Sequence, residues 1–171
     1  ITRSRKEIDL FMSSCKRSVI KPLYGNGGQG IFLLDKNDKN YNQIIEKFID
    51  EDSVPFIVQK FLPDIIKGDK RIILINGEPI AALKRIPKKN EFRSNIHVGG
   101  STKAVALTRN DIKICNIIKE TLISEKLFFV GIDIIGNYLT EINVTSPTCI
   151  QEIKRVHKID IAKIIFDRLG Y

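Results

Sequence analysis

The stretch 128–149, FFVGIDIIGNYLTEINVTSPTC, decides the fold of this chain. Two apolar, β-branched runs flank a short turn, and a polar loop follows them, so the stretch predicts a β-hairpin. Three side chains with oxygen atoms interrupt the apolar runs, namely Asp133, Glu141 and Asn143. Hard divalent cations such as Mg²⁺ bind carboxylate and amide oxygens. These three residues are therefore candidate metal ligands.

The register of the hairpin decides whether the three candidate ligands can meet. A two-residue turn places Asp133 opposite Thr140, and the other two ligands then point to the opposite face, because a slip of one residue turns every side chain over. A three-residue loop at 136–138 places Asp133 opposite Glu141 and leaves all three on one face. We prefer this second register, because it separates polar from apolar side chains better. A half-buried amphipathic strand without a metal is the alternative.

The composition limits the class of protein. The 171 residues suffice for one domain or two small lobes, and the 43% hydrophobic and 28% charged residues are ordinary for a soluble globular protein. No apolar run is long enough to span a membrane, and the N-terminal ITRSRKEIDLF lacks the apolar core of a signal sequence. The three cysteines are widely spaced, which favours reduced thiols in a cytoplasmic protein.

The formal net charge of +8 favours an anionic partner such as a nucleotide, an acidic peptide or a nucleic acid. The lysines are scattered and form no long basic run. We therefore expect neither a nucleic acid nor a membrane as partner. The sequence leaves a homo-oligomer open.

A glycine-rich segment, GNGGQG at 25–30, lies between two predicted strands. It matches the pattern G-x-G-x-x-G, but that dinucleotide motif should open a helix, and a strand follows here. A glycine-rich hairpin brings backbone N–H groups close to phosphates. Lys21, just before the segment, is placed to meet a phosphate oxygen. A flexible hairpin with a surface lysine is the alternative.

Hydrophobic periodicity predicts the remaining elements. Ser4 and Glu7 fit a capping box at the start of the first helix. Helices are predicted at 4–16, 41–50, 108–125 and 160–169, and strands at 18–21, 31–34, 56–61, 69–75 and 79–86. The segment 86–103 has no regular pattern, and we predict a mobile lid there that excludes water from a reactive intermediate.

Three charged residues lie within the predicted hairpin at 69–86. Arg71 and Arg85 are candidates to bind carboxylates or phosphates bidentately, and Asp69 is a candidate ribose ligand. Taken alone, each of the three is more often a surface residue.

Three segments, GIDIIGNYLTEINVTSPTC, IKPLYGNGGQGIF and DKRIILINGEPI with KRIP, resemble bacterial glutathione synthetase, an ATP-grasp ligase. The resemblance covers nearly all of the chain. It implies an α+β ATP-grasp fold with a nucleotide bound between two lobes, 1–62 and 63–171. It also implies that the three hairpin ligands hold Mg²⁺ against the ATP phosphates, and it does not decide between Mg²⁺ and Mn²⁺.

The resemblance also implies a role for each matched residue. ATP contacts fall on Lys21, Gly27, Gly28, Gln29, Gln59, Lys60, Phe61, Leu62 and Asp69. Catalytic roles fall on Arg71, Arg85 and the lid residue Arg93. Substrate contacts fall on Arg71, Arg93, Asn143, Thr145, Ser146, Pro147 and Thr148. Family members often have a glycine after the lid arginine, where this chain has Ser94.

The implied activity is ATP-dependent ligation of γ-glutamylcysteine to glycine through an acyl phosphate, with ADP and phosphate released. Another ATP-grasp carboxylate–amine ligase and a non-catalytic ATP-binding module are the alternatives. The chain begins at Ile1, without a methionine, and lacks the family's N-terminal domain and an earlier ATP-contacting lysine. We therefore expect an incomplete enzyme that makes no glutathione by itself.

Overall fold

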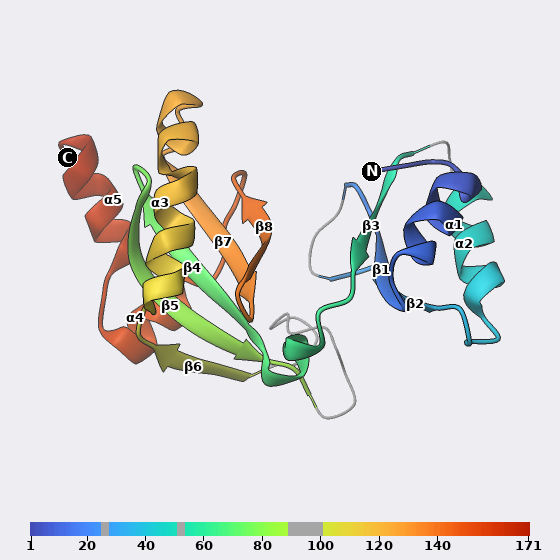
Figure 1. Cartoon of the computed structure of the whole chain (residues 1–171). Coiled ribbons are helices and arrows are strands. Elements are labelled where there is room, and N and C mark those ends of the chain that lie inside the picture. The colour runs from blue at the N-terminus through green and yellow to red at the C-terminus, as the bar shows by residue number, and fades with distance from the viewer. Residues whose placement is uncertain (25–27, 51–53, 89–100) are drawn as a thin grey trace. The chain divides into compact units, whose positions relative to one another are not determined.

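The computed structural model describes residues 1–24, 28–50, 54–88 and 101–171. These residues form two compact units, Ile1–Pro63 and Asp64–Tyr171, and each has its own sheet and core. The first unit contains α1 (Arg5–Ser13), β1 (Arg17–Pro22), β2 (Phe32–Asp35), α2 (Tyr41–Asp50) and β3 (Phe56–Lys60) (Figure 1). A 3₁₀ turn, η1 (Pro63–Lys67), follows. The combination of helices with antiparallel sheets confirms the α+β class.

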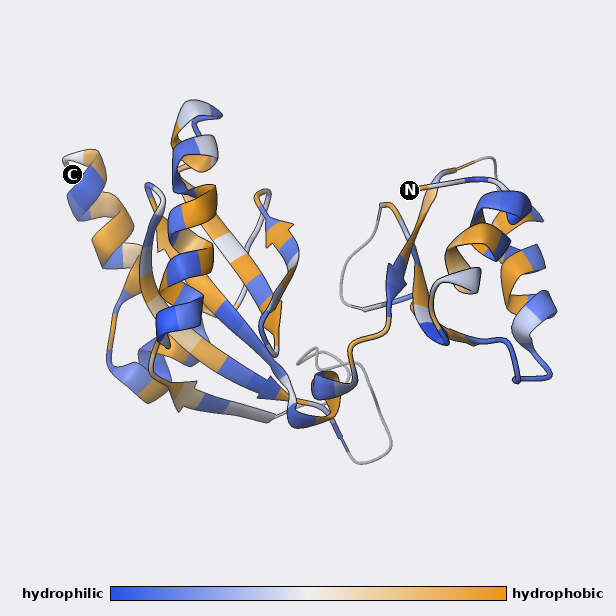
Figure 2. Ribbon diagram, viewed as in Figure 1, coloured by the Kyte–Doolittle hydropathy of each residue, from blue (hydrophilic) through white to orange (hydrophobic). Residues whose placement is uncertain are grey.

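The second unit contains β4 (Asp69–Ile75), β5 (Glu78–Ile86), β6 (Ser101–Val105), α3 (Arg109–Ser124), β7 (Phe129–Ile135), β8 (Tyr138–Asn143), α4 (Ile150–His157) and α5 (Ile161–Leu169). Each helix carries both hydrophobic and hydrophilic residues (Figure 2), as expected of helices that cover a sheet. None of the helices in the described ranges is long and apolar enough to cross a bilayer.

The first unit is a three-stranded antiparallel sheet, in the order β2-β1-β3, that α1 and α2 cover. Its core joins both helices to all three strands through Ile8, Met12, Ile20, Leu34, Tyr41, Ile45 and Phe56. The strands β1 and β2 pair antiparallel, so the glycine-rich segment does connect two neighbouring strands of a hairpin.

The predicted capping box at the start of α1 is wrong. Ser4 is the N-cap residue, but its side chain makes no capping hydrogen bond. The hydroxyl of Thr2 takes that place: it accepts a hydrogen bond from the Ser4 amide at 2.9 Å and donates one to Glu7. Thr2 is held there because its backbone bridges to Phe56. A contact with a distant strand therefore overrides the local signal.

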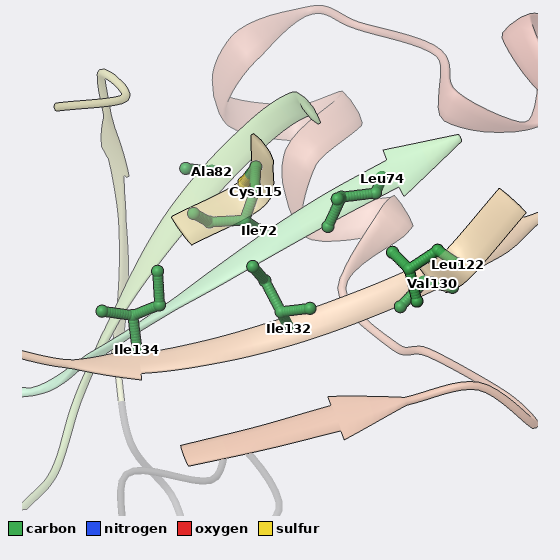
Figure 3. Close-up of a cluster of buried hydrophobic side chains, with 8 residues drawn as sticks. All are labelled: Ile72, Leu74, Ala82, Cys115, Leu122, Val130, Ile132 and Ile134. Carbon is green, nitrogen blue, oxygen red and sulfur yellow. The ribbon is translucent and has the colours of Figure 1, made fainter. Parts of the chain in front are cut away.

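The second unit is a five-stranded antiparallel sheet in the order β6-β5-β4-β7-β8. Alternation along the strands gives it two cores. On one face, α3 packs on the sheet through the cluster drawn in Figure 3. The helix contributes Cys115 and Leu122, and the strands contribute Ile72, Leu74, Ala82, Val130, Ile132 and Ile134. On the other face, α4 and α5 contribute Ile153 and Ile161 to a second cluster. Its other members are Ile73, Ile75, Ala81, Leu83 and Cys149.

Two elements of this unit differ from the sequence predictions. The segment 86–103 was expected to be a loop, yet 101–105 forms β6 at the sheet edge, where its small and polar residues pair with β5. The helix α4 was not predicted at all. Its N-cap residue, Cys149, has a left-handed φ of 85° and makes no side-chain capping hydrogen bond, so the usual start signal is missing. The expected lid residues 90–100, including Arg93 and Ser94, lie outside the described residues.

Candidate active site

The hairpin of β7 and β8 has the register that brings the candidate ligands together. Asp133 lies opposite Glu141, and Gly131 lies opposite Asn143. Because residues opposite one another, and residues two apart on one strand, share a face, Asp133, Glu141 and Asn143 lie on the same face of the sheet. The amide nitrogen of Asn143 lies 3.2 Å from the Gly131 carbonyl oxygen and 3.5 Å from Asp133 Oδ2. The prediction of a shared face is confirmed.

The predicted cause of that register is wrong. Ile135 pairs with Tyr138 across a two-residue turn, so the loop is not the expected three residues long. Instead, the pairing shifts between Asp133 and Ile134, where Thr140 is an extra residue in β8. The Thr140 hydroxyl donates to the Asp133 carbonyl at 3.0 Å and so fixes the bulge. A β-bulge, and not a longer loop, therefore places Asp133 opposite Glu141.

A second bulge aligns the charged residues of β4 and β5. The pairing shifts between Ile73 and Leu74 and leaves Ile80 as an extra residue in β5. Without the shift, the two-residue turn would place Lys84 opposite Asp69. With it, Asp69 lies opposite Arg85.

Four of these side chains form a buried ionic network across β5, β4 and β7. Arg71 donates from Nε and Nη2 to the two oxygens of Asp133, the second at 2.9 Å. Arg85 donates from Nε to Asp69 Oδ1 at 2.8 Å and from Nη2 to Asp69 Oδ2. The same Nη2 lies 2.9 Å from Asp133 Oδ2. The side chains are only 4% to 7% exposed, so water screens these charges little.

The network keeps Asp133 and Arg85 ionised. Burial acts to raise the pKa of Asp133, but the hydrogen bond from Arg71 and the charges of both arginines outweigh it and hold that pKa below its usual value. Burial acts to lower the pKa of Arg85, and the hydrogen bond to Asp69 with the nearby carboxylates raises it instead. Asp133 and Arg85 therefore stay charged at neutral pH although both side chains are buried.

Gly131 lets the polar loop approach the sheet. A Cβ atom at this position would lie 2.8 Å from Pro147 Cβ and 3.2 Å from Arg71 Cδ. The absence of a side chain therefore allows the loop and the arginine to pack over β7. The sequence reasoning missed this residue, although a glycine inside a predicted strand signals a close backbone approach.

The loop after β8 borders the network. Arg71 Nη1 donates to the Thr148 hydroxyl at 3.4 Å, and Pro147 is buried. Thr145, Ser146 and Thr148 are exposed, as residues that contact a substrate need to be. Three of the four loop residues that the resemblance marks for substrate thus offer exposed hydroxyl groups, and that of Thr148 contacts the buried Arg71.

The residues marked for ATP lie mostly in the first unit. Lys21 is in β1, opposite Ile57 of β3, and its side chain is half-buried. Gln59 and Lys60 are in β3, the Phe61 amide donates to the Arg17 carbonyl at 3.1 Å, and Leu62 is half-buried. Gly28 and Gln29 lie in the turn before β2, and Gly27 lies outside the described residues. Asp69, the candidate ribose ligand, is buried and pairs with Arg85.

The hairpin ligands fit a hard divalent cation in type and number. In the described ranges no three His, Cys, Asp or Glu side chains gather at one point. The candidate set is thus two carboxylates and one amide, and Mg²⁺ in phosphate-transfer sites usually has one or two carboxylates together with substrate phosphates. Asp133 is already paired with arginines. A carboxylate offers about four lone-pair positions, so an ion would have to share it with them.

Solved structures of ATP-grasp ligases share this fold. The ATP-grasp ligase PsnB, in complex with the precursor peptide PsnA2 and AMPPNP, matches with a TM-score of 0.68 at 20% identity, over 98% of this chain and 50% of that one. D-alanine–D-alanine ligase from Bacillus anthracis, in complex with ATP, matches with a TM-score of 0.62 at 12% identity, over 94% of this chain and 53% of that one. The expected ATP-grasp fold is confirmed.

Sequence relatives narrow the family. The glutathione synthetase of Agrobacterium fabrum is 43% identical over 169 residues, which are 99% of this chain and 53% of the relative. That of Synechococcus elongatus is 46% identical over 161 residues, 94% of this chain and 50% of the relative. The chain thus spans about half the length of the curated relatives it matches. Residues 1–158 match the family described as prokaryotic glutathione synthetase, ATP-grasp domain, and the chain belongs to this family.

Proposed function

We propose that this chain supplies the ATP-binding and phosphoryl-transfer part of a glutathione synthase. The observation that carries the proposal is one face of the second sheet. There Asp133, which shares the face with Glu141 and Asn143, pairs with two buried arginines. Sites that transfer phosphoryl groups need such fixed cations and carboxylates, and need no protein nucleophile. The family match supports the same chemistry.

In the proposed reaction, a carboxylate oxygen of γ-glutamylcysteine bonds to the γ-phosphorus of ATP. The bond from that phosphorus to the bridging oxygen breaks, which gives ADP and an acyl phosphate. The glycine amine then attacks the acyl carbon, phosphate leaves, and the nitrogen loses a proton. Bound Mg²⁺, or Mn²⁺ with the same oxygen ligands, would neutralise charge on the phosphate oxygens.

The residues of the chain take separate roles in this proposal. Asp133, Glu141 and Asn143 would hold the ion. Arg71 and Arg85 would stabilise negative charge on the transferring group and the substrate carboxylate, because guanidinium groups bind planar anions bidentately. The loop 145–148 would contact the peptide substrate. Lys21, Gly28 and Gln29 would contact the ATP phosphates, and the backbone of 59–62 the adenine.

A chimeric enzyme tests the proposal. The segment of the Agrobacterium fabrum glutathione synthetase that matches this chain, about half of that protein, is replaced by this chain. We expect the purified chimera to form glutathione from ATP, γ-glutamylcysteine and glycine. A folded chimera that binds ATP but forms no glutathione would contradict the proposal. The same replacement with Glu141→Ala in this chain is the matched negative control.

Substrate pairs separate the alternatives. Phosphate release from the chimera with a different acid–amine pair, and not with γ-glutamylcysteine and glycine, would favour another ATP-grasp ligase. Binding of ATP without phosphate release, whatever the pair offered, would favour a non-catalytic module.

A further inference from the structure

Arg85 has two acidic neighbours, and it does not contact them equally. It donates from Nε and Nη2 to the two oxygens of Asp69, directly opposite in the sheet. Its Nη2 also lies 2.9 Å from Asp133 Oδ2. A bidentate guanidinium–carboxylate pair is stronger and better oriented than a single contact. Asp69 is therefore the stronger partner.

Asp133 Oδ2 has two cationic neighbours. Arg71 Nη2 also donates to this oxygen, at 2.9 Å, so two guanidinium groups already approach it. The Asp133 side chain is only 4% exposed, so water offers little compensation for a lost contact. A divalent cation at Asp133 therefore competes with arginines for the same carboxylate. The more firmly Arg85 binds Asp69, the less it competes with the cation for Asp133.

We propose that Asp69 is a positioning residue that retains Arg85 and thereby leaves Asp133 to the divalent cation. The inference rests on the proposed role of Asp133 as a metal ligand. In this account Asp69 acts on the ion through Arg85. Without Asp69, the freed guanidinium turns further toward Asp133, whose Oδ2 already lies 2.9 Å from Nη2, and competes more strongly with the cation.

A double-mutant cycle on the purified chain tests this. The variants are Asp69→Asn, Arg85→Gln and the double variant, with Asp167→Asn as the control, because that carboxylate is exposed on α5 and pairs with Lys163 of the same helix. The measurement is Mn²⁺ binding without nucleotide, followed by the electron paramagnetic resonance signal of the free ion. Circular dichroism confirms that each variant is folded.

We expect Asp69→Asn to weaken Mn²⁺ binding about tenfold, the scale of coupling between groups in one charged network. In the Arg85→Gln background the same substitution should have no effect, since the competing guanidinium is gone. An equal loss in both backgrounds would show a simple effect of charge, and no loss in either would show no role in ion binding. Both results would overturn the inference.

Two further outcomes remain decisive. If Asp69→Asn alone fails to fold, Arg85→Gln decides the question: the inference requires it to bind Mn²⁺ more tightly than the wild type, and equal or weaker binding overturns it. If the wild-type chain binds no Mn²⁺, the metal site of the proposed function falls, and the inference falls with it. Wild-type binding that Asp69→Asn leaves unchanged would overturn the inference alone.

Discussion

Asp133 belongs both to the candidate ion site and to the buried ionic network. It shares a face of the sheet with Glu141 and Asn143, and it pairs with Arg71 and Arg85. Its pairing with Arg71 and Arg85 was not predicted, although Arg71 lies directly opposite it on the neighbouring strand. The reason is physical. Pairing between β4 and β7, which are far apart in the chain, follows from packing of the whole sheet and leaves no local pattern.

Glu141 should be required for catalysis, because it supplies the second carboxylate of the proposed ion site. In the chimeric enzyme, Glu141→Ala should lower the rate of glutathione formation by roughly a hundredfold or more, the scale of losing a group that stabilises developing charge. Steady-state kinetics measure this. Glu120→Ala, at an exposed position of α3, is the control and should leave the rate unchanged. A Glu141→Ala chimera with the wild-type rate would exclude that role.

Gly131→Ala should destabilise the second unit and disturb Arg71. The added methyl group would crowd Pro147 and the arginine stem, and overpacking of this kind costs about 1–3 kcal/mol. Urea unfolding measures the loss. Adding Pro147→Gly should recover part of it, because the contact at 2.8 Å is with the proline Cβ. Full wild-type stability in Gly131→Ala would show that the loop adapts freely.

Among the elements, the two hairpins of the second unit carry the site, and each needs a bulge. Thr140 in β8 and Ile80 in β5 are the extra residues that place acidic and basic side chains on one face. With regular pairing from the turns, Glu141 would not lie opposite Asp133, and Arg85 would not lie opposite Asp69. Sequence patterns predict turns and alternation, but a bulge depends on tertiary contacts, such as the hydrogen bond from Thr140 to the Asp133 carbonyl.

Deletion of Thr140 should therefore be tolerated better than its place in the site suggests. Without the extra residue, regular pairing from the turn still sets Asp133 opposite Glu141, so Mn²⁺ binding by the chain should persist. Deletion of Ile142 is the matched control. It moves either Glu141 or Asn143 off the shared face and should weaken binding at least about tenfold, the scale of a disrupted ligand shell. The reverse order of effects would contradict the bulge assignment.

The N-terminal cap of α3 should make the folding stability of the second unit depend on pH. Asp111 is 1% exposed, forms a capping box with Thr108 and pairs with Lys70. Burial acts to raise its pKa, but the bonds from Lys70 and Thr108 hold that pKa below the ordinary 3.8. A carboxylate with a lowered folded pKa stabilises the fold above its unfolded pKa, and the effect is lost as pH falls through the folded value.

Asp111→Asn should accordingly lower the free energy of unfolding by about 1–3 kcal/mol at pH 7, the scale of disrupting a buried charged hydrogen bond. The difference from the wild type should shrink as pH falls below about 4, near the ordinary value of 3.8. Urea unfolding between neutral and acidic pH measures both. Asp167→Asn, exposed on α5, should change stability by no more than about 0.5 kcal/mol at pH 7. A difference independent of pH would contradict the role given to the Asp111 charge.

Across the whole chain, the sequence predicted most of the strands and helices, because each has a hydrophobic period that matches its core. Ile8 and Met12 of α1, and Ile45 of α2, are buried in the first unit, as their spacing indicates. The helix α4 and the strand β6 were missed, since the first lacks a capping signal and the second lacks an apolar face. The resemblance indicated the ATP-grasp fold and the activity that we propose, neither of which follows from periodicity alone.

The central claim is that Asp133, Glu141 and Asn143 hold a divalent cation against the phosphates of ATP. The most direct test is a crystal structure of this chain with Mn²⁺ and AMPPNP, in which anomalous scattering locates the metal. We predict an anomalous peak within about 2.5 Å of oxygens from these three side chains and of a phosphate oxygen, a distance typical of oxygen-ligated divalent cations. A bound nucleotide whose metal lies away from this face, with Asp133 still held by both arginines alone, would contradict the account.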